Sequence, residues 1–219
     1  MRRRCSNLTR AALEVAHVCL DDGSASDVRS IFASRHGESE VTVRTLTELA
    51  KGNPLSPNDF SLSVHNTSSG LFSIFSKNTQ ASTAVAGGRH SLDALFLEVF
   101  SSLASAPTTP VHAVIADMPC PKEFGSLKRN PCYALAFVLR AGGGEDALEF
   151  RFDGSPIDAE KEDSPETQIR TAVEDFLLWA FTPEKQDPFT SKESGWCISA
   201  RANWRSKFRP IQGVVKEAA

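Results

Sequence analysis

The sequence predicts an α/β protein that folds as a single domain over residues 1–219. Two short apolar runs, at residues 28–34 and 111–116, are typical of buried strands. Residues 80–116 contain, in order, a predicted strand, a Gly-Gly turn, a helix and a second strand. This order is typical of a βαβ unit, in which the two strands are parallel and the crossover is right-handed.

The segments around the first strand predict helices. Apolar side chains at helical spacing mark one face of residues 7–20, namely Leu8, Ala11, Ala12, Val15, Ala16 and Cys19. A second helix is expected over residues 41–51, and Gly52-Asn53-Pro54 ends it. Ser56 then has the features of a helix N-cap followed by a proline, and residues 70–75 predict another short helix.

The stretch around the Gly-Gly turn is the most informative part of the chain. We expect a buried strand at residues 80–85 that leads through Gly87-Gly88 into a helix whose apolar stripe comprises Leu92, Leu95, Phe96, Val99 and Leu103. A helix N-terminus lowers the pKa of a thiol and supplies donors to an oxyanion, so an enzyme would place a cysteine there. This chain has Val85 instead. The stretch therefore has the form of a nucleophile site without a nucleophile.

The C-terminal part has a different character. Residues 133–139 and 147–152 predict two strands that pair as a hairpin through Gly142-Gly143-Gly144. A charged loop at residues 156–165 precedes the rest. An amphipathic helix is then expected over residues 167–181, with its inward face formed by Ile169, Ala172, Val173, Phe176, Leu177 and Ala180. Residues 196–204 alternate in a way that predicts a last strand.

Composition excludes several classes of function. The formal net charge is −3, and Arg2-Arg3-Arg4 is the longest basic run, so we expect no nucleic-acid binding. No stretch approaches the 20 or so apolar residues of a membrane span, and no clean signal peptide is present. The cysteines are odd in number and lack metal-ligand spacing; they are Cys5, Cys19, Cys120, Cys132 and Cys197. We therefore expect a cytoplasmic protein with reduced thiols, no metal and no membrane contact.

The histidines give no recognisable catalytic set. They are His17, His36, His65, His90 and His112. His36 follows a predicted strand, where active groups often lie in α/β folds, and His65 is expected to be buried and hydrogen-bonded. No Gly-x-Ser-x-Gly sequence accompanies them, so a Ser-His-Asp hydrolase is not predicted. The Gly-Gly turn also lacks the Gly-x-Gly-x-x-Gly and Walker patterns of nucleotide sites.

Taken together, five motifs resemble those of a known family. In chain order they are Arg35-His36-Gly37-Glu38, Pro54-Leu55-Ser56-Pro57, Phe60-Ser61-Leu62-Ser63-Val64-His65-Asn66, Ser82-Thr83-Ala84-Val85-Ala86-Gly87-Gly88 and Ala116-Asp117-Met118-Pro119. As a set, they resemble the N-terminal half of β-ketoacyl synthases. More narrowly, they resemble the short stand-alone synthase-like proteins of bacterial type II fatty acid and aryl polyene pathways. The resemblance covers residues 4–124.

The resemblance implies a fold. It is a thiolase-like half-fold, with a mixed, mainly parallel sheet flanked by helices and an added hairpin and helix at the C-terminus. Residues 1–125 would form the synthase-like core of the single domain, and residues 126–219 would form an extension packed on that core.

The resemblance also implies that this chain is not an enzyme. In working synthases the motif reads Thr-Ala-Cys, and the cysteine attacks the acyl thioester, whereas Thr83-Ala84 is followed here by Val85. The family also takes two histidines, or a histidine and an asparagine, from its C-terminal half, and we expect the chain to end before such a half. Valine has no lone pair for covalent acyl transfer, so no catalytic residue and no cofactor are expected.

The implied function is that of a chain-length-factor-like subunit. Such a subunit would heterodimerise with a full-length β-ketoacyl synthase, which recruits the acyl carrier protein, and would complete its acyl tunnel in aryl polyene, fatty acid or polyketide elongation. The expected interface and tunnel residues are Phe60, His65, Asn66, Phe72, Phe75, Ser82, Thr83, Ala84, Val85, Ala86 and Gly87. These aromatics could instead fill the core of the chain itself.

Two other functions remain open from the sequence. One is a residual thioester hydrolase or malonyl decarboxylase that uses His36, His65 or a cysteine. The other is a homodimeric scaffold that pairs through the same strand.

Overall fold

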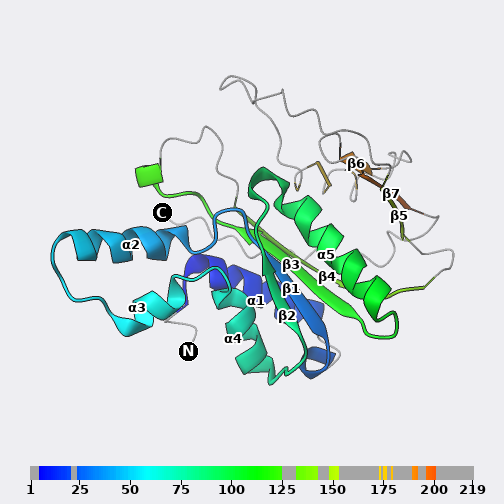
Figure 1. Ribbon diagram of the computed structural model, residues 1–219, viewed down its shortest axis with the longest axis horizontal. Helices are drawn as coiled ribbons and strands as arrows, with labels where there is room; N and C mark the ends of the chain where they lie inside the picture. The colour runs from blue at the N-terminus through cyan, green and yellow to red at the C-terminus, as the bar shows by residue number, and fades with distance from the viewer. Residues whose placement is uncertain are drawn as a thin grey trace. The chain divides into compact units, whose positions relative to one another are not determined.

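The computed structural model describes residues 5–20, 24–124, 132–142, 148–152, 173, 175–176, 179, 189–191 and 196–200 (Figure 1). The described residues belong to two compact units. The first unit includes the described residues up to Ala141, and the second includes Gly142 and the described residues from 148 onward.

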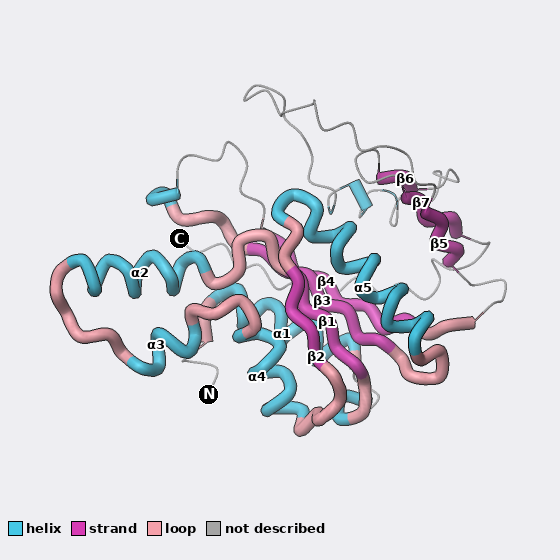
Figure 2. The backbone as a smooth tube through the Cα atoms, in the orientation of Figure 1, coloured by secondary structure: helices cyan, strands magenta, loops and turns pink. Residues whose placement is uncertain are grey.

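The first unit is built on a mixed sheet with the strand order β2-β1-β3-β4 (Figure 2). The strands are β1 (Arg29–Ala33), β2 (Ser82–Val85), β3 (Val111–Asp117) and β4 (Tyr133–Leu139). β1 pairs in parallel with both β2 and β3, and β4 pairs antiparallel with β3. The sheet is therefore mixed and mainly parallel, as the resemblance implied.

The predicted βαβ unit is only partly correct. β2 and β3 run in the same direction, as expected, but they are not neighbours, because β1 lies between them. Ile31 in β1 is opposite Thr83 on one side and opposite Ala113 on the other. The helix between β2 and β3 thus connects two strands that are separated in the sheet by one strand, β1.

The prediction that residues 80–85 form a buried strand is wrong in one respect. Ser82 is exposed and the other three residues of β2 are half-buried. In contrast, all seven residues of β3 are buried. The physical reason is that β3 has neighbours on both sides, whereas among the described strands β2 pairs with β1 alone and lies at the edge of the sheet.

Five α-helices accompany this sheet. They are α1 (Asn7–Cys19), α2 (Ser39–Ala50), α3 (Pro57–Leu62), α4 (Thr67–Ser76) and α5 (Ser91–Ser105), with 3-10 turns η2 (Ser24–Ser26), η3 (Gly88–His90) and η4 (Lys122–Phe124). The helices confirm the elements predicted from periodicity, and the side chain of Ser56 caps α3 by accepting a hydrogen bond from the Asp59 N–H. The whole predicted apolar stripe of α5 is buried.

The helices cover both faces of the sheet. Leu8, Ala12 and Ala16 of α1 form one core cluster with Phe32, Phe72, Val114 and Ala116. On the other face, Phe96 of α5 lies 6.3 Å from Phe137 of β4, measured between ring centroids. Alternate residues of a strand point to opposite faces, so β1 and β3 contribute to both layers. α2 and α3 extend away from the sheet (Figure 1), and Val41 is the only buried residue of α2.

The second unit contains an antiparallel sheet with the order β5-β7-β6. Its strands are β5 (Leu148–Phe152), β6 (Phe189–Ser191) and β7 (Trp196–Ala200). Val173 and Phe176 are helical and buried, in agreement with the helix predicted there. Asp175 and Trp179 are helical as well. The other residues of that helix, the charged loop at residues 156–165 and residues 201–204 lie outside the described residues.

The predicted hairpin between residues 133–139 and 147–152 is wrong. Both segments are strands, but β4 pairs with β3 and β5 pairs with β7. β3 is buried along its whole length, and β4 pairs with the edge of β3 that β1 leaves free. The sheet therefore continues past the predicted boundary at residue 125, and the single-domain assignment stays a prediction.

Arg29, the first residue of β1, holds the C-terminal end of α5. Its Nη2 atom donates to the carbonyl oxygens of Ser102 at 2.7 Å, Ala106 at 3.1 Å and Thr109 at 3.4 Å. The carbonyls at the C-terminal end of a helix carry partial negative charge. Ser102 lies in the last turn of α5 and Ala106 is its C-cap, so the Arg29 guanidinium adds charge-assisted hydrogen bonds at this helix end and joins it to β1.

We predict that Arg29→Met lowers the free energy of unfolding by about 2 kcal/mol, because charge-assisted hydrogen bonds to helix-terminal carbonyls are lost. Urea unfolding followed by circular dichroism measures this change. The matched control is Lys51→Met, which removes an exposed ion pair to Glu48 and should cost less than about 0.5 kcal/mol. Equal effects of the two variants would contradict the role of Arg29.

Candidate functional site

A buried carboxylate organises the ends of β1, β3 and β4. Asp117 is only 2% exposed. It accepts hydrogen bonds from the Ser34 hydroxyl at 2.8 Å, the Arg35 N–H at 2.8 Å and the His36 N–H at 3.0 Å. The Tyr133 hydroxyl donates to its other oxygen at 2.7 Å. Four donors therefore satisfy this charge, and together they fix the loop that follows β1.

His65 holds the same loop from the opposite side. Its Nε2 atom lies 3.1 Å from the carbonyl oxygen of Ser34. The ring packs on Gly37, where an added Cβ would lie 2.9 Å from the ring carbon Cδ2 and where φ is +54°. A side chain at residue 37 would thus be excluded both by the His65 ring and by the backbone conformation. The expected hydrogen bond of His65 is present, but the residue as a whole is exposed rather than buried.

Val85 lies next to this loop. It is the last residue of β2, it is half-buried, and its carbonyl oxygen accepts a hydrogen bond from the Ser34 N–H at 3.3 Å. Because Ser34 is itself bound to Asp117, the end of β2 is connected to the Asp117 carboxylate through one residue. Val85 therefore occupies a rigid position at the carboxyl end of the parallel strands, where ligands of α/β folds usually bind.

The turn after Val85 is longer than expected. Residues 86–90, which include the 3-10 turn η3, separate Val85 from the first residue of α5. Gly88 has a φ of +57°, and a Cβ at Gly87 would lie 2.7 Å from the His90 carbonyl oxygen, so both glycines are required. The Gly87 N–H donates to the Ser91 hydroxyl and the His90 N–H donates to the Gly87 carbonyl. These two turn N–H groups are therefore engaged within the turn.

The loop does not form a Ser-His-Asp set. The Ser34 hydroxyl is buried and donates directly to Asp117, with no histidine between them. His36 is half-buried, and burial lowers its pKa, while the Asp117 charge acts in the opposite direction. Nucleophilic catalysis needs a base within hydrogen-bond reach of the nucleophile. This arrangement therefore gives no support to a hydrolase at Ser34.

Sequence reasoning missed a second buried carboxylate, that of Glu38. Its Oε1 atom accepts hydrogen bonds from the Thr9 hydroxyl at 2.5 Å and the Ser6 hydroxyl at 2.8 Å. Thr9 in turn lies 3.1 Å from the Ser68 hydroxyl. Burial raises the pKa of Glu38, and the two hydroxyl donors oppose that shift. Glu38 thus joins the N-terminal ends of α1, α2 and α4. The sequence did not reveal this contact, because nothing in the positions of Ser6, Thr9 and Ser68 indicates that they meet.

The three aromatics expected at an interface differ in exposure. Phe60 is 61% exposed and Phe75 is 44% exposed. Phe72 is 4% exposed and packs on Phe32 at a centroid distance of 5.5 Å, so it fills the core of this chain, the alternative that the sequence left open. Ile74, which sequence reasoning missed, is 66% exposed on α4.

The remaining expected site residues lie along β2 and its ends. Ser82 accepts a hydrogen bond from the Ser30 hydroxyl at 3.1 Å. Thr83 and Ala84 are half-buried, and Ala86 is exposed. Asn66 is exposed at the N-terminus of α4, and its side chain makes no capping hydrogen bond. The β2 residues thus form one open strand edge, whereas Asn66 belongs to the helical segment.

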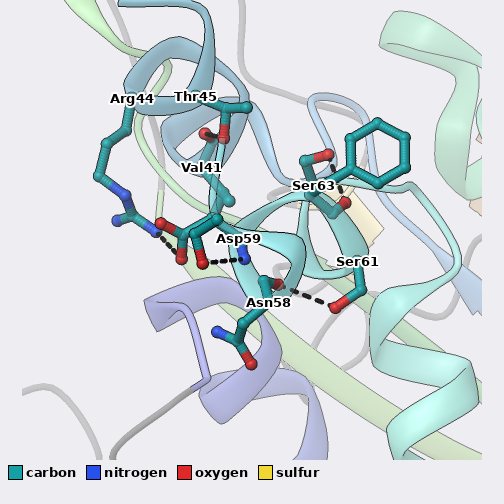
Figure 3. A network of polar contacts seen from close by, with 9 residues as sticks. Val41, Arg44, Thr45, Asn58, Asp59, Ser61 and Ser63 are labelled. Atoms are coloured by element: carbon teal, nitrogen blue, oxygen red, sulfur yellow. Dashed lines mark hydrogen bonds and ion pairs between the residues drawn. The ribbon is translucent and has the colours of Figure 1, made fainter. Parts of the chain in front are cut away.

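Local contacts hold α3 against α2 (Figure 3). Figure 3 shows Arg44 of α2 beside Asp59 of α3, with Nη2 and Oδ1 3.4 Å apart. The Ser61 hydroxyl donates to the Asn58 carbonyl at 2.8 Å within α3 itself. No residue of α3 is buried. The segment that carries Phe60 is therefore held by surface contacts and leaves its apolar side chain accessible.

We predict that Asp117→Asn lowers the free energy of unfolding by about 3 kcal/mol, because the amide turns a donor toward groups that are themselves donors. Tyr133→Phe removes one hydrogen bond and should cost about 1 kcal/mol. Asp59→Asn, on the exposed pair with Arg44, is the matched control. Urea unfolding measures the stability of the variants. If Asp117→Asn is as stable as Asp59→Asn, or more stable, the organising role of Asp117 is refuted.

We predict opposite effects for two glycine substitutions. Gly87→Ala should destabilise the protein by about 2 kcal/mol, because its Cβ would clash with backbone atoms of His90. Gly70→Ala should stabilise the protein by about 1 kcal/mol, since it lies within α4 and no atom lies within 4 Å of the added Cβ. Thermal and urea unfolding measure both. The same sign for both variants would show that the turn is not constrained as described.

Comparisons with known proteins agree with this fold. The sequence profile described as "Beta-ketoacyl synthase, N-terminal domain" matches residues 1–199. Among the described residues, no helix is both long and apolar enough to cross a membrane. No curated protein sequence matches the chain significantly.

Solved structures similar in fold include two complexes of a ketosynthase with a chain length factor. One is the ketosynthase ApeO in complex with its chain length factor ApeC from Xenorhabdus doucetiae, with a TM-score of 0.72 and 24% identity over 90% of this chain and 79% of the matched chain. The other is the ishigamide ketosynthase/chain length factor, with a TM-score of 0.54 and 17% identity over 68% of this chain and 50% of that chain. The sheet and its flanking helices thus form the thiolase-like half-fold of ketosynthases. Since the family profile covers most of its length, the chain belongs to the β-ketoacyl synthase N-terminal domain family.

Proposed function

We propose that this chain is a non-catalytic, chain-length-factor-like subunit that pairs with an active β-ketoacyl-[acyl carrier protein] synthase in the cytoplasm. The observation that carries the proposal is Val85, a hydrocarbon side chain at the end of β2. In the synthase motif that this stretch resembles, the nucleophilic cysteine stands at this position. Both similar structures contain a ketosynthase together with a chain length factor, which supports a partner of the same kind.

The chemistry of the site favours binding over catalysis. Valine cannot form a thioester, so the catalytic cysteine and histidines would come from the partner. The N–H groups of Gly87 and His90 are engaged within the turn, and the Ser34 hydroxyl is bound to Asp117. The proposed role is therefore to complete the acyl tunnel of the synthase in aryl polyene, fatty acid or polyketide elongation, with the acyl carrier protein reaching the complex through the synthase.

The open edge of β2 supplies the proposed contact. The carbonyl of Ala81 accepts a hydrogen bond from the N–H of Ser30 in β1, and the carbonyl of Val85 accepts one from the N–H of Ser34, the residue after β1. Successive residues of a strand direct their N–H and C=O groups to opposite sides, so Thr83 also faces β1. Ser82 and Ala84 therefore present unpaired backbone groups at the edge of the described sheet, ready to pair with a strand of the partner.

Exposed apolar side chains lie on the helical segment that precedes β2 in the sequence. Ile74 and Phe75 are exposed on α4, and Phe60 is exposed on α3. α4 packs beside β2 and β1. An apolar surface next to an unpaired strand edge is typical of a protein interface. We propose that these side chains contact the synthase, with Phe60 or Phe75 near the end of its acyl tunnel.

We predict that Ala84→Pro abolishes the complex while the chain stays folded. Proline removes an N–H that points away from β1, so the β1–β2 ladder keeps its hydrogen bonds and only pairing with a partner is lost. The matched control is Ala84→Val, which keeps the N–H and should retain the complex. Co-expression with a full-length β-ketoacyl synthase from the same organism, followed by size-exclusion chromatography and an elongation assay, measures both.

Four outcomes would refute the proposal. One is a wild-type chain that does not bind the synthase, and another is a complex that Ala84→Pro leaves intact. A homodimer of the isolated chain that excludes the synthase would point to the scaffold instead. Covalent capture of a labelled acyl group on the isolated chain would show that it is an enzyme.

A further inference from the structure

His112 is a buried imidazole in the centre of the first-unit sheet. It is the second residue of β3, with Ser30 of β1 opposite on one side and Val138 of β4 on the other. Its exposed fraction is 0%. This side chain belongs neither to the Asp117 site nor to the proposed interface.

The ring of His112 is enclosed by aromatic side chains. The Phe72 ring of α4 lies 5.2 Å away between centroids, and the Phe32 ring of β1 lies 6.4 Å away in an edge-on arrangement. Neither ring nitrogen of His112 has a hydrogen-bond partner among the described residues. A neutral imidazole leaves one donor and one acceptor unsatisfied there, and a protonated one would leave two donors and a charge.

Phe72 is the only buried apolar side chain of α4. The other buried residues of this helix are Thr67, Ser68 and Ser69. Phe72 is therefore the main apolar anchor of α4, with Leu71 only half-buried, and the Phe72 ring packs against His112. A charge on His112 would be placed directly against this anchor.

No nearby titratable group compensates a charge on His112. The titratable side chains on or beside the surrounding elements are Arg10, Glu14, His17 and Cys19 of α1, Asp27, Arg29, Arg35 and His36 on or next to β1, Glu38 before α2, Lys77 after α4, Asp117 of β3, Tyr133 and Arg140 on or next to β4, and Asp93 and Glu98 of α5. None of them is hydrogen-bonded to the ring, and α4 contains no titratable residue. Glu38 acts in the opposite direction to His112, because burial raises its pKa and protonation favours its buried state.

We propose that His112 is a proton-sensitive latch: the neutral ring holds α4 on the sheet, and uptake of one proton from solvent releases α4. Release would also move Ile74 and Phe75, which lie on the same helix, so acidification would weaken binding to a partner. That consequence rests on the proposed function, whereas the latch itself is a property of the isolated chain.

The direction of the effect follows from linkage. Burial lowers the pKa of His112 from 6.5 to about 4. A released His112 binds a proton below pH 6.5, and a buried one only near pH 4, so acid favours release and the closed state is fully stable above pH 6.5. The equilibrium constant for release should therefore rise about 30-fold between pH 7.5 and pH 5.0.

Amide hydrogen exchange of the isolated wild-type chain, corrected for the intrinsic pH dependence of exchange, tests the latch. We expect opening of α4 to increase about 30-fold from pH 7.5 to pH 5.0, while α5, on the other face, changes less than about threefold. His112→Leu should remove the increase. His17→Leu, a substitution at an exposed histidine of α1, is the matched control and should retain it.

Three exchange results would overturn the latch. They are a wild-type α4 without pH dependence, an increase that His112→Leu retains, and an equal increase in α5, which would indicate global unfolding.

NMR titration of labelled histidines in the wild-type chain gives a test that needs no altered core. A His112 ring that titrates at or above pH 6.5 in the folded protein would also refute the latch. The exchange experiment uses the isolated chain and tests the latch alone, whereas co-purification with the synthase tests the proposed function. A negative result in one experiment is therefore distinguishable from a negative result in the other.

Discussion

The Asp117 carboxylate determines how the ends of three strands meet. A buried carboxylate must be matched by donors, and Asp117 obtains them from Ser34, from two consecutive backbone N–H groups and from Tyr133. The backbone donors require the chain to turn immediately after β1. Since the N–H of Ser34 also binds the carbonyl of Val85, the same turn positions the end of β2. The location of Val85 therefore depends on a charge that lies more than thirty residues away in the sequence.

The other end of this loop is held differently. Glu38 receives its hydrogen bonds from the hydroxyls of Ser6 and Thr9, and its Oε2 atom is buried without a hydrogen-bond partner. Burial raises the pKa of Glu38, so ionisation there costs folding free energy. The end of the loop that binds Asp117 is thus firmly fixed. The end at Glu38, which contacts α1 and α4, is a weaker connection. This difference is consistent with α4 being the element that can separate from a rigid sheet.

Local periodicity predicted the helices well and the strand pairing poorly. The stripe of α5 from Leu92 to Leu103 could be read from the sequence, because helical spacing is set within a few residues. The partner of β4 could not, since both a hairpin and pairing with β3 suit its apolar residues. The donors to Asp117 and Glu38 were also missed, because short polar side chains carry no signal of a contact across 30 or 80 residues.

The β2 edge differs from the edges that protect monomeric proteins. Such edges usually carry lysine, proline or a bulge that prevents pairing with another strand. β2 has the sequence Ser82-Thr83-Ala84-Val85, without charge or proline, and its pairing with β1 is regular. Threonine and valine are β-branched and favour extended backbone. Val85 thus contributes to strand formation, and under the proposed function the same residue stands where an active synthase would need a thiol.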